Sequence, residues 1–140
     1  GNLTVVSASL QATMSLSGNE NIDIIQLGGM LRHSSASVVG QYSMEFLRGC
    51  SFSKLFLGVD GIDVDFGIST TDIREAELNR AMMQAAQKTI VLADSSKFGR
   101  RGFAKISGME DIDTIITDAK IPHAVAKRIE EMGIDLIIAG

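Results

Sequence analysis

The chain has 140 residues, of which 13 are Lys or Arg and 17 are Asp or Glu, so its formal net charge is −4 at pH 7. Hydrophobic residues make up 45% of the sequence and aromatic residues 5%. A chain of this length buries about two-thirds of its unfolded surface in one core, so we expect a single globular domain and exclude a disordered chain. The acidic balance argues against a DNA-binding surface in these residues, because DNA binding normally requires several Lys and Arg side chains.

Cysteine and histidine are too sparse to suggest a disulfide framework or a metal site. Cys50 is the single cysteine, and neither His33 nor His123 has another histidine or a cysteine at ligand spacing. No stretch approaches the roughly 18 to 20 consecutive apolar residues that a membrane helix requires. We therefore expect a cytoplasmic protein that needs no cofactor and has no contact with a membrane.

Short apolar runs rich in β-branched residues recur along the chain. Runs of this kind are typical of strands that are buried on both faces, as in a parallel sheet covered by helices. The least periodic stretch, 99–108, contains a further candidate for a small edge strand at 103–106. The main predicted strands cover residues 3–6, 22–27, 55–59, 89–92, 114–117 and 136–138.

Helical patterns lie between these runs. The clearest begins near Pro122, because proline suits a first helical turn, apolar residues recur at helical spacing as far as Met132, and Gly133 can end the helix. In a second helix, Asp72 and Glu75 are spaced as a capping box. The predicted helices cover residues 9–17, 41–48, 72–87 and 122–132. The alternation predicts an α/β fold, namely a Rossmann-like, mostly parallel sheet with helices on both faces.

Three of the predicted strands are followed by an aspartate, at Asp60, Asp94 and Asp118. Open α/β sheets bind ligands beyond the carboxyl ends of their strands, so each of these carboxylates is a candidate ligand contact. An aspartate in this position is also a common turn former or helix cap. For Asp94 and Asp118 both interpretations stay open.

The sequence around Asp60 favours a ligand site more strongly. Gly58-Val59-Asp60-Gly61-Ile62-Asp63 places the carboxylates of Asp60 and Asp63 three residues apart, beside glycines that permit close approach of a ligand. The alternative is structural, with Asp63 and Asp65 as turn residues.

A group of hydroxyls follows this motif. Ser69, Thr70 and Thr71 come shortly after it, and Glu75 stands at the start of the predicted helix. Hydroxyls and a helix N-terminus suit phosphate or sugar oxygens. The alternative is that the hydroxyls are helix caps and that Glu75 is the second member of the capping box.

Three cations lie in a loop beyond the strand that ends near Asp94. Lys97 is the nearest to the strand and is our candidate for holding an anionic ligand, with a solvated surface position as the open alternative. Arg100 and Arg101 are better explained as solvated surface residues. Gly28-Gly29 follows another strand, and a double glycine forms a tight turn more often than a phosphate cradle.

The order of several motifs resembles the C-terminal effector-binding domain of DeoR-family bacterial transcription regulators. Examples are Leu27-Gly28-Gly29-Met30-Leu31-Arg32 and Ala93-Asp94-Ser95-Ser96-Lys97-Phe98-Gly99. The motifs run in order over essentially the whole chain. They cover residues 2–7, 27–32, 38–40, 56–62, 67–70, 75–78 and 93–99.

The resemblance implies a fold similar to ribose-5-phosphate isomerase and the CoA transferases. It also implies a domain that senses a phosphorylated sugar or related metabolite, usually as a homo-oligomer, and that controls an N-terminal winged helix-turn-helix which binds the DNA. Such regulators usually repress carbohydrate-use genes. By position, the resemblance implies a pocket lined by Asp60, Ser69, Thr70, Thr71, Glu75 and Lys97, with Ser7, Ser9, Gly28 and Gly29 close to it.

The chain departs from the family pattern in two places. Ser7-Ala8-Ser9-Leu10 stands where members commonly have Thr-Asn-Ser-Leu, so the amide is missing. The family's phosphate loop, a turn of the Asp-Ser-Gly-Thr-Thr type, belongs before Leu3. We therefore expect that residues 1–140 form one effector-binding domain that lacks its first strand, loop and helix as well as the DNA-binding domain.

Two other functions are compatible with the motifs. The motif that begins at Gly58 also resembles the Gly-Ala-Asp-Glu-Ile-Asp stretch of ribose-5-phosphate isomerases, which transfer a proton between sugar carbons. However, residues 64–74 contain no lysine, and Arg74 cannot exchange protons near neutral pH. A binding pocket is therefore preferred to an isomerase. The third possibility is an oligomerisation module with a vestigial pocket.

Overall fold

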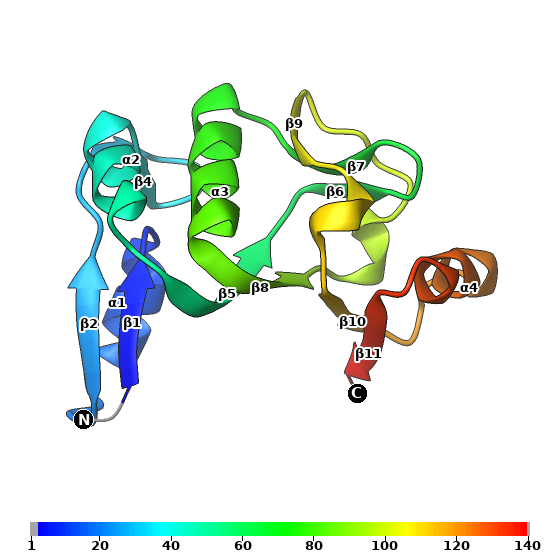
Figure 1. The fold of residues 1–140 in the computed structure, drawn as a ribbon, viewed down its shortest axis with the longest axis horizontal. Coiled ribbons are helices and arrows are strands. Elements are labelled where there is room, and N and C mark those ends of the chain that lie inside the picture. The colour runs from blue at the N-terminus through cyan, green and yellow to red at the C-terminus, as the bar shows by residue number, and fades with distance from the viewer. Residues whose placement is uncertain (1–2, 140) are drawn as a thin grey trace. The chain divides into compact units, whose positions relative to one another are not determined.

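The computed structural model describes residues 3–139, in which strands alternate with short helices. The chain divides into two compact units that meet in sequence at Gly49 and Cys50. Figure 1 labels most of the helices and strands of both units.

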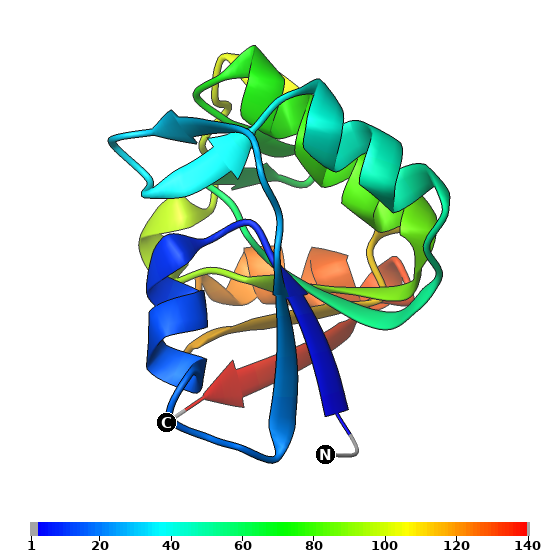
Figure 2. The same ribbon diagram turned by 90° about the vertical axis from the view of Figure 1, so that its left-hand side faces the viewer.

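The first unit is built on two parallel strands joined by a helix. β1 (Leu3–Ser7) and β2 (Ile22–Gln26) pair along their whole length, and α1 (Leu10–Leu16) connects them. The two strands lie side by side in Figure 2. The rest of the unit is an antiparallel hairpin and one helix, namely β3 (Met30–Arg32), β4 (Ser37–Val39) and α2 (Gln41–Arg48).

The second unit contains a four-stranded parallel sheet with the strand order β11-β10-β8-β5. Its strands are β5 (Phe52–Gly58), β8 (Ala86–Leu92), β10 (Thr114–Asp118) and β11 (Asp135–Ala139). A smaller antiparallel sheet has the order β6-β7-β9. Its strands are β6 (Gly61–Asp63), β7 (Gly67–Thr70) and β9 (Ala104–Ser107).

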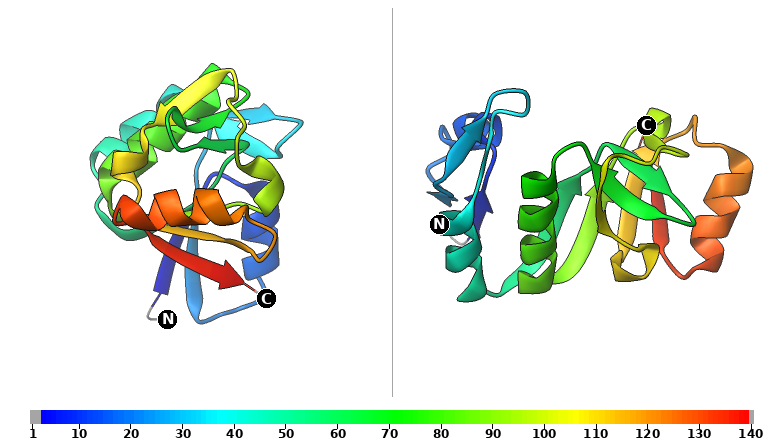
Figure 3. Two further views of the ribbon diagram at one scale, coloured as in Figure 1. Left: turned by 90° about the vertical axis from the view of Figure 1, so that its right-hand side faces the viewer. Right: turned by 90° about the horizontal axis from the view of Figure 1, so that it is seen from above.

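Helices connect these strands. α3 packs against β5, β8 and the small sheet, and α4 packs along β11, as Figure 3 shows. Two short 3-10 helices, η1 and η2, follow β8 and β9. The bounds are α3 (Ile73–Ala85), α4 (His123–Glu131), η1 (Ser95–Lys97) and η2 (Met109–Asp111).

One face of the four-stranded sheet carries the core of the second unit. Leu57, Val91 and Ile115 stand next to one another across β5, β8 and β10, and all three are buried. Ile68 of the small sheet and Ile129 of α4 are fully buried in the same cluster. The core therefore joins the two sheets and α4 through aliphatic contacts.

The opposite face of this sheet is also apolar. Successive strand residues point to opposite faces, so Phe56, Leu92 and Ile137 lie on the face away from the core. They are 58%, 41% and 49% exposed. Apolar residues on both faces are typical of a parallel sheet.

The predicted α/β fold with a mostly parallel sheet is confirmed. Every predicted strand and helix is present with small shifts at its ends, and the candidate edge strand corresponds to β9. The largest shifts are that β5 and β8 each begin three residues earlier than predicted, at Phe52 and Ala86, which pair with each other. α3 accordingly ends at Ala85, because Ala86 has extended backbone angles. β3, β4, β6 and β7 were not predicted, since strands of three or four residues are too short to show a period. No helix within residues 3–139 combines the length and the apolar character that a bilayer span would need.

Candidate functional site

Three parallel strands of the second unit end at one edge of the sheet. β5, β8 and β10 are neighbours and run in the same direction, so Asp60, Asp94 and Asp118 all lie at or just beyond their carboxyl ends. Ligands of open α/β sheets bind at this edge. This edge is therefore the expected location of a ligand site.

Asp94 and Asp118 hold the backbone of this edge together. The Asp94 carboxylate accepts hydrogen bonds from the hydroxyl of Ser96 and, at 2.8 Å, from its backbone N–H, and these bonds lower the pKa of Asp94. The Asp118 carboxylate accepts the backbone N–H groups of Ser95 and Lys120 at 2.8 and 2.9 Å, which lower its pKa in the same way. Asp94 thus caps η1, and Asp118 links the loops that follow β8 and β10. Both roles are structural, in line with the interpretation of these aspartates as turn formers or helix caps.

Asp60 is different, because its carboxylate meets a side-chain hydroxyl. Oγ1 of the buried Thr70 lies 2.8 Å from Asp60 Oδ2 and 3.3 Å from Glu75 Oε2. A threonine hydroxyl has one proton, so it can donate to one of the two carboxylates at a time. We call Asp60, Thr70 and Glu75 the carboxylate cluster; it gathers several hydrogen-bond acceptors around a single donor.

A hairpin and a helix start bring the carboxylate cluster together. The backbone N–H of Asp60 donates to the Ser69 carbonyl at 3.0 Å, which places Asp60 beside the end of β7. Asp72 caps α3 and accepts the backbone N–H of Glu75 at 3.2 Å. Because α3 begins so soon after β7, the first-turn residue Glu75 comes within reach of Thr70. The positive end of the helix dipole also favours a carboxylate in this turn.

Ser69 and Thr71 flank Thr70 in sequence but have different surroundings. Ser69 is fully buried, and its Oγ accepts the backbone N–H of Gly102 at 2.7 Å. Thr71 is exposed. Of the three neighbouring hydroxyls, the one of Thr70 contacts the carboxylates of Asp60 and Glu75.

Asp63 lies at the far end of β6 and closes the turn between β6 and β7. Its Oδ1 accepts the backbone N–H groups of Asp65 and Phe66 at 2.8 and 2.9 Å, and its Oδ2 accepts Nε of Arg101 at 3.0 Å. Arg101 and these backbone groups lower the pKa of Asp63 to about 2. The Arg101 guanidinium and the Lys105 ammonium also lie 5.4 and 5.2 Å from the centre of the Phe66 ring. Both oxygens of Asp63 thus have partners within the turn.

The substitution Asp63→Asn removes this charge and keeps an oxygen for the two backbone N–H groups. The pKa of Asp63 falls from 3.8 to about 2 on folding. The ionised form therefore stabilises the fold above pH 3.8, and this gain is lost as the pH falls through about 2. Arg101 is 56% exposed, so screening reduces the gain; we expect the variant to lose about 1 kcal/mol of unfolding free energy at pH 7.

Urea denaturation at pH 7 and at pH 2 measures this difference. The variant and the unmodified chain should differ at pH 7 and converge at pH 2. Asp65→Asn is the matched control, because Asp65 pairs with Arg128 at 2.9 Å in a more exposed place, where the loss should be smaller. A difference for Asp63→Asn that is equally large at both pH values would show that its charge is not responsible.

Lys97 leads into a segment that lies along the β6–β7 hairpin. Lys97 is half-buried at the end of η1. After it, Phe98 forms a bridge with Ile62, and the N–H of Gly99 donates to the Ile62 carbonyl at 2.7 Å. Gly99 has φ of +81°, a conformation that favours glycine. Lys97 is therefore fixed to the same edge of the sheet as Asp60.

Ser7 and Ser9, in the first unit, form a local turn after β1. Ser7 Oγ accepts the backbone N–H of Ser9 at 3.0 Å and donates to the Ser9 carbonyl at 3.1 Å. Ser9 Oγ accepts the backbone N–H of Ala12 at 3.2 Å and caps α1. Both hydroxyls serve the connection between β1 and α1.

Gly28 and Gly29 follow β2, whose carboxyl end lies beside that of β1. The Gly28 carbonyl accepts the hydroxyl of the buried Ser43 at 2.6 Å. A Cβ on Gly29 would lie 2.4 Å from the Val39 carbonyl oxygen, so a side chain does not fit there. The pair forms a bend between β2 and β3 in which Gly29 packs closely on the backbone of Val39.

The predicted site residues thus fall into two groups, one in each unit. Ser7, Ser9, Gly28 and Gly29 belong to the first unit, and Asp60, Asp63, Ser69, Thr70, Thr71, Glu75 and Lys97 to the second. Sequence analysis missed the partner of Ser69, Gly102. One sequence signal could have indicated this contact. Gly99 and Gly102 flank two arginines, and glycines at this spacing suit a loop that packs closely on a neighbouring strand.

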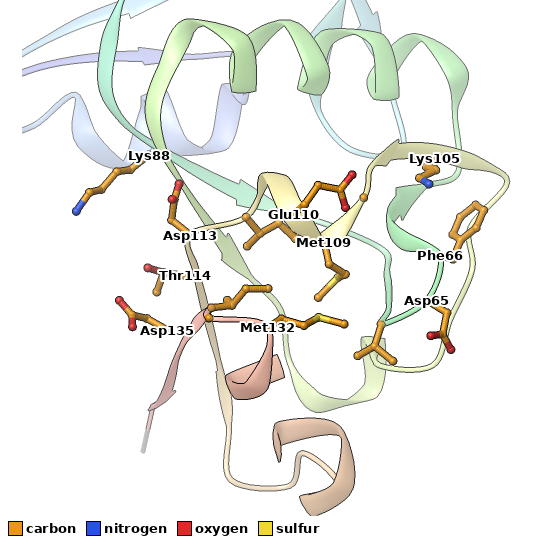
Figure 4. Close-up of a pocket in the computed structure, with 15 residues that line it drawn as sticks. Asp65, Phe66, Lys88, Lys105, Met109, Glu110, Asp113, Thr114, Met132 and Asp135 are labelled. Carbon is orange, nitrogen blue, oxygen red and sulfur yellow. The ribbon is translucent and has the colours of Figure 1, made fainter. Parts of the chain in front are cut away.

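A separate open pocket of about 700 Å³ lies at the amino ends of β8, β10 and β11. Figure 4 shows Lys88 and Asp113 on one side of it, Phe66 on the other, and the side chains of Met109 and Met132 between them. None of the predicted site residues lines this pocket. It lies at the opposite end of the sheet from the carboxylate cluster. Within residues 3–139 there is also no group of three or more His, Cys, Asp or Glu side chains placed to hold a metal ion.

Comparison with protein families identifies the chain. Residues 1–119 match the family described as the DeoR C-terminal sensor domain. The chain belongs to this family. The resemblance inferred from the motifs is therefore confirmed, and the chain is a sensor domain of DeoR-type transcriptional regulators.

Curated relatives of this DeoR sensor domain are transcriptional regulators. A protein of Escherichia coli O157:H7 that is named as a transcriptional repressor for the aga operon is 38% identical over 99% of the chain and 49% of its own length. The regulator GlpR of Haloferax volcanii is 31% identical over 96% of the chain and 53% of its length. The glycerol-3-phosphate regulon repressor of E. coli K12 is 28% identical over 96% of the chain and 54% of its length. The chain thus spans about half the length of these relatives.

Proposed function

We propose that this DeoR sensor domain binds a phosphorylated sugar or a related small metabolite. The binding would control a DNA-binding domain that lies outside these residues and represses carbohydrate-use genes. The observation that carries the proposal is the carboxylate cluster at the carboxyl edge of the four-stranded sheet. The names of the relatives, which include a glycerol-3-phosphate regulon repressor, support a ligand of this class.

The chemistry of the edge suits such a ligand. Carboxylate oxygens of Asp60 and Glu75 accept hydrogen bonds from sugar hydroxyls. The ammonium of Lys97 is a counter-charge for phosphate, and the exposed Thr71 hydroxyl can donate to either group. The carboxylates would thus contact the sugar hydroxyls of the ligand, and the cation would contact its phosphate.

We propose a sensor and not an isomerase. Moving a proton between sugar carbons needs a base at the C–H and a cation at the developing oxyanion. The lysine that ribose-5-phosphate isomerases carry between the aspartates and the glutamate has no counterpart in residues 64–74. In addition, the Asp63 carboxylate is bonded within the β6–β7 turn, so the motif that resembles isomerases offers only Asp60 to a ligand.

A coupled assay for aldose–ketose conversion of sugar phosphates tests this choice. We expect no turnover above a blank from the chain, and no change on Glu75→Ala. Turnover that Glu75→Ala abolishes would support the isomerase instead. Glu77→Ala, an exposed residue of the same helix, is the matched control for effects on α3 alone.

The proposal extends to assembly and location. We propose a homo-oligomeric regulator that acts in the cytoplasm, whose DNA contacts are made by an N-terminal domain. We also propose that the sensor is completed by a first strand, loop and helix that supply the phosphate loop of the family.

Thermal melting of the complete sensor, including the proposed first strand, loop and helix, with glycerol 3-phosphate and with aldose and ketose phosphates tests the sensor proposal. A ligand that binds only the native state raises the melting temperature, and the rise grows with the logarithm of the ligand concentration above its Kd. We expect at least one of these phosphates to do so, with the phosphate-free sugars as controls. If none does while light scattering shows a stable oligomer, the oligomerisation module is the better explanation.

A further inference from the structure

We propose that Ser69 is a positioning residue and not a ligand contact. In this proposal its hydroxyl fixes the segment 98–102 against the β6–β7 hairpin and so holds the basic side chains of Lys97 and Arg100 in place for the ligand phosphate. The inference rests on the proposed function for the identity of the ligand. The contact between Ser69 and Gly102 is independent of that function and follows from the structure alone.

The burial of Ser69 is the first step. Its relative exposure is 0%, and its Oγ accepts the N–H of Gly102 at 2.7 Å. A ligand in solvent would have to displace the loop to reach this oxygen. The Ser69 hydroxyl is also the acceptor for the backbone N–H of Gly102, in the connection between β8 and β9. Buried backbone donors of this kind need a partner.

Two glycines leave no spare room around this contact. A Cβ on Gly61 would lie 2.6 Å from the Arg100 carbonyl oxygen and 2.8 Å from Ser69 Oγ. A Cβ on Gly102 would lie 2.7 Å from the Thr70 carbonyl oxygen and 3.1 Å from Ser69 Oγ. Backbone therefore packs directly on backbone on both sides of Ser69. This close packing allows the segment 98–102 a single position against the β6–β7 hairpin.

The same segment carries Arg100 and Arg101, and Lys97 comes directly before it. The segment is anchored at one end by the N–H of Gly99 on the Ile62 carbonyl at 2.7 Å, and at the other end by Ser69. Arg100 and Arg101 lie between the two anchors. Arg101 is already bonded to Asp63, whereas Arg100 is exposed.

Fixing this short stretch in advance reduces the conformational freedom that a cation loses when it engages an anion. Ser69 thereby acts on the ligand through Lys97 and Arg100. It needs no contact with the ligand itself.

Hydrogen exchange of the unliganded chain tests the contact without any ligand. In Ser69→Ala the amide of Gly102 loses its acceptor, so we expect its exchange to become at least about tenfold faster while amides of α4 keep their rates. Ser107→Ala is the matched control, because that hydroxyl donates to the adjacent Gly108 carbonyl in the same small sheet. Unchanged exchange at Gly102, or faster exchange throughout the second unit, would overturn the positioning role.

Calorimetric titration with glycerol 3-phosphate tests the link to the basic residues. Ser69→Ala should weaken binding about tenfold in the unmodified chain, but less than about twofold when Lys97 and Arg100 are already alanine, since coupled residues are not additive. Equal weakening in both backgrounds would overturn the proposal, because Ser69 would then act independently of the cations. The titrations use the complete sensor, including the proposed phosphate loop. If it binds none of the phosphates tested, the proposed function fails, and the exchange result still decides whether Ser69 holds the segment.

Discussion

Replacing Asp60 by alanine is expected to weaken the binding of a sugar phosphate by at least about tenfold. The substitution removes the carboxylate that faces the Thr70 hydroxyl and offers acceptors at the sheet edge. Lys97→Ala should cause a loss of similar size, because it removes the counter-charge for the phosphate. Isothermal titration calorimetry with a phosphate that raises the melting temperature measures both effects.

The two variants should differ in their response to salt. The contribution of Lys97 is mainly charge, so its loss should matter less as ionic strength rises, whereas the hydrogen bonds of Asp60 are less sensitive to screening. Asp94→Asn is the control, since this residue lies at the same edge but serves as a cap that asparagine can replace. Unchanged affinity in both Asp60→Ala and Lys97→Ala would refute the site.

The second large effect is expected from Gly67→Ala in the small sheet. Gly67 has φ of +111°, and an added Cβ would lie 2.1 Å from the carbonyl oxygen of Ser107 in β9. Alanine is disfavoured at this φ, and the clash is with backbone that cannot turn aside. We expect a loss of about 3 kcal/mol in the free energy of unfolding, measured by urea denaturation.

Gly133→Ala separates strain from contact. Gly133 also has a positive φ, +83°, but nothing lies within 4 Å of an added Cβ. This variant should lose only the cost of the left-handed conformation, about 1 kcal/mol. Equal losses in the two variants would mean that β7 and β9 are not packed as closely as the structure shows.

The main elements of the fold could be predicted because they are long enough to have a period. Apolar runs such as 89–92 and the helical spacing that starts at Pro122 each correspond to an element of the structure. The small sheet could not be predicted in the same way. Its pairing depends on contacts between residues distant in sequence, such as Ser69 opposite Lys105, which no local pattern expresses.

The candidate site was predictable in its composition but not in its geometry. Strand order alone indicates that Asp60 and Lys97 share an edge, and the structure adds that Thr70 and Glu75 meet Asp60. Sequence patterns could not show that Ser69 points away from Thr70, because two adjacent hydroxyls look alike until a strand places them on opposite faces. The roles of Asp94 and Asp118 likewise depend on backbone N–H groups that only the folded loops bring within reach.

The β6–β7 turn and the aliphatic core of the second unit are held by different forces and therefore respond to different solution conditions. The β6–β7 turn depends on the charges of Asp63 and Arg101, and high salt weakens such contacts because the screening length falls to about 3 Å at 1 M. The four-stranded sheet depends on aliphatic burial at residues such as Val91, which weakens on cooling instead. Asp60 lies in the link between β5 of the four-stranded sheet and β6 of the small sheet, and Thr70 lies in β7. The geometry of the carboxylate cluster is therefore subject to both ionic strength and temperature.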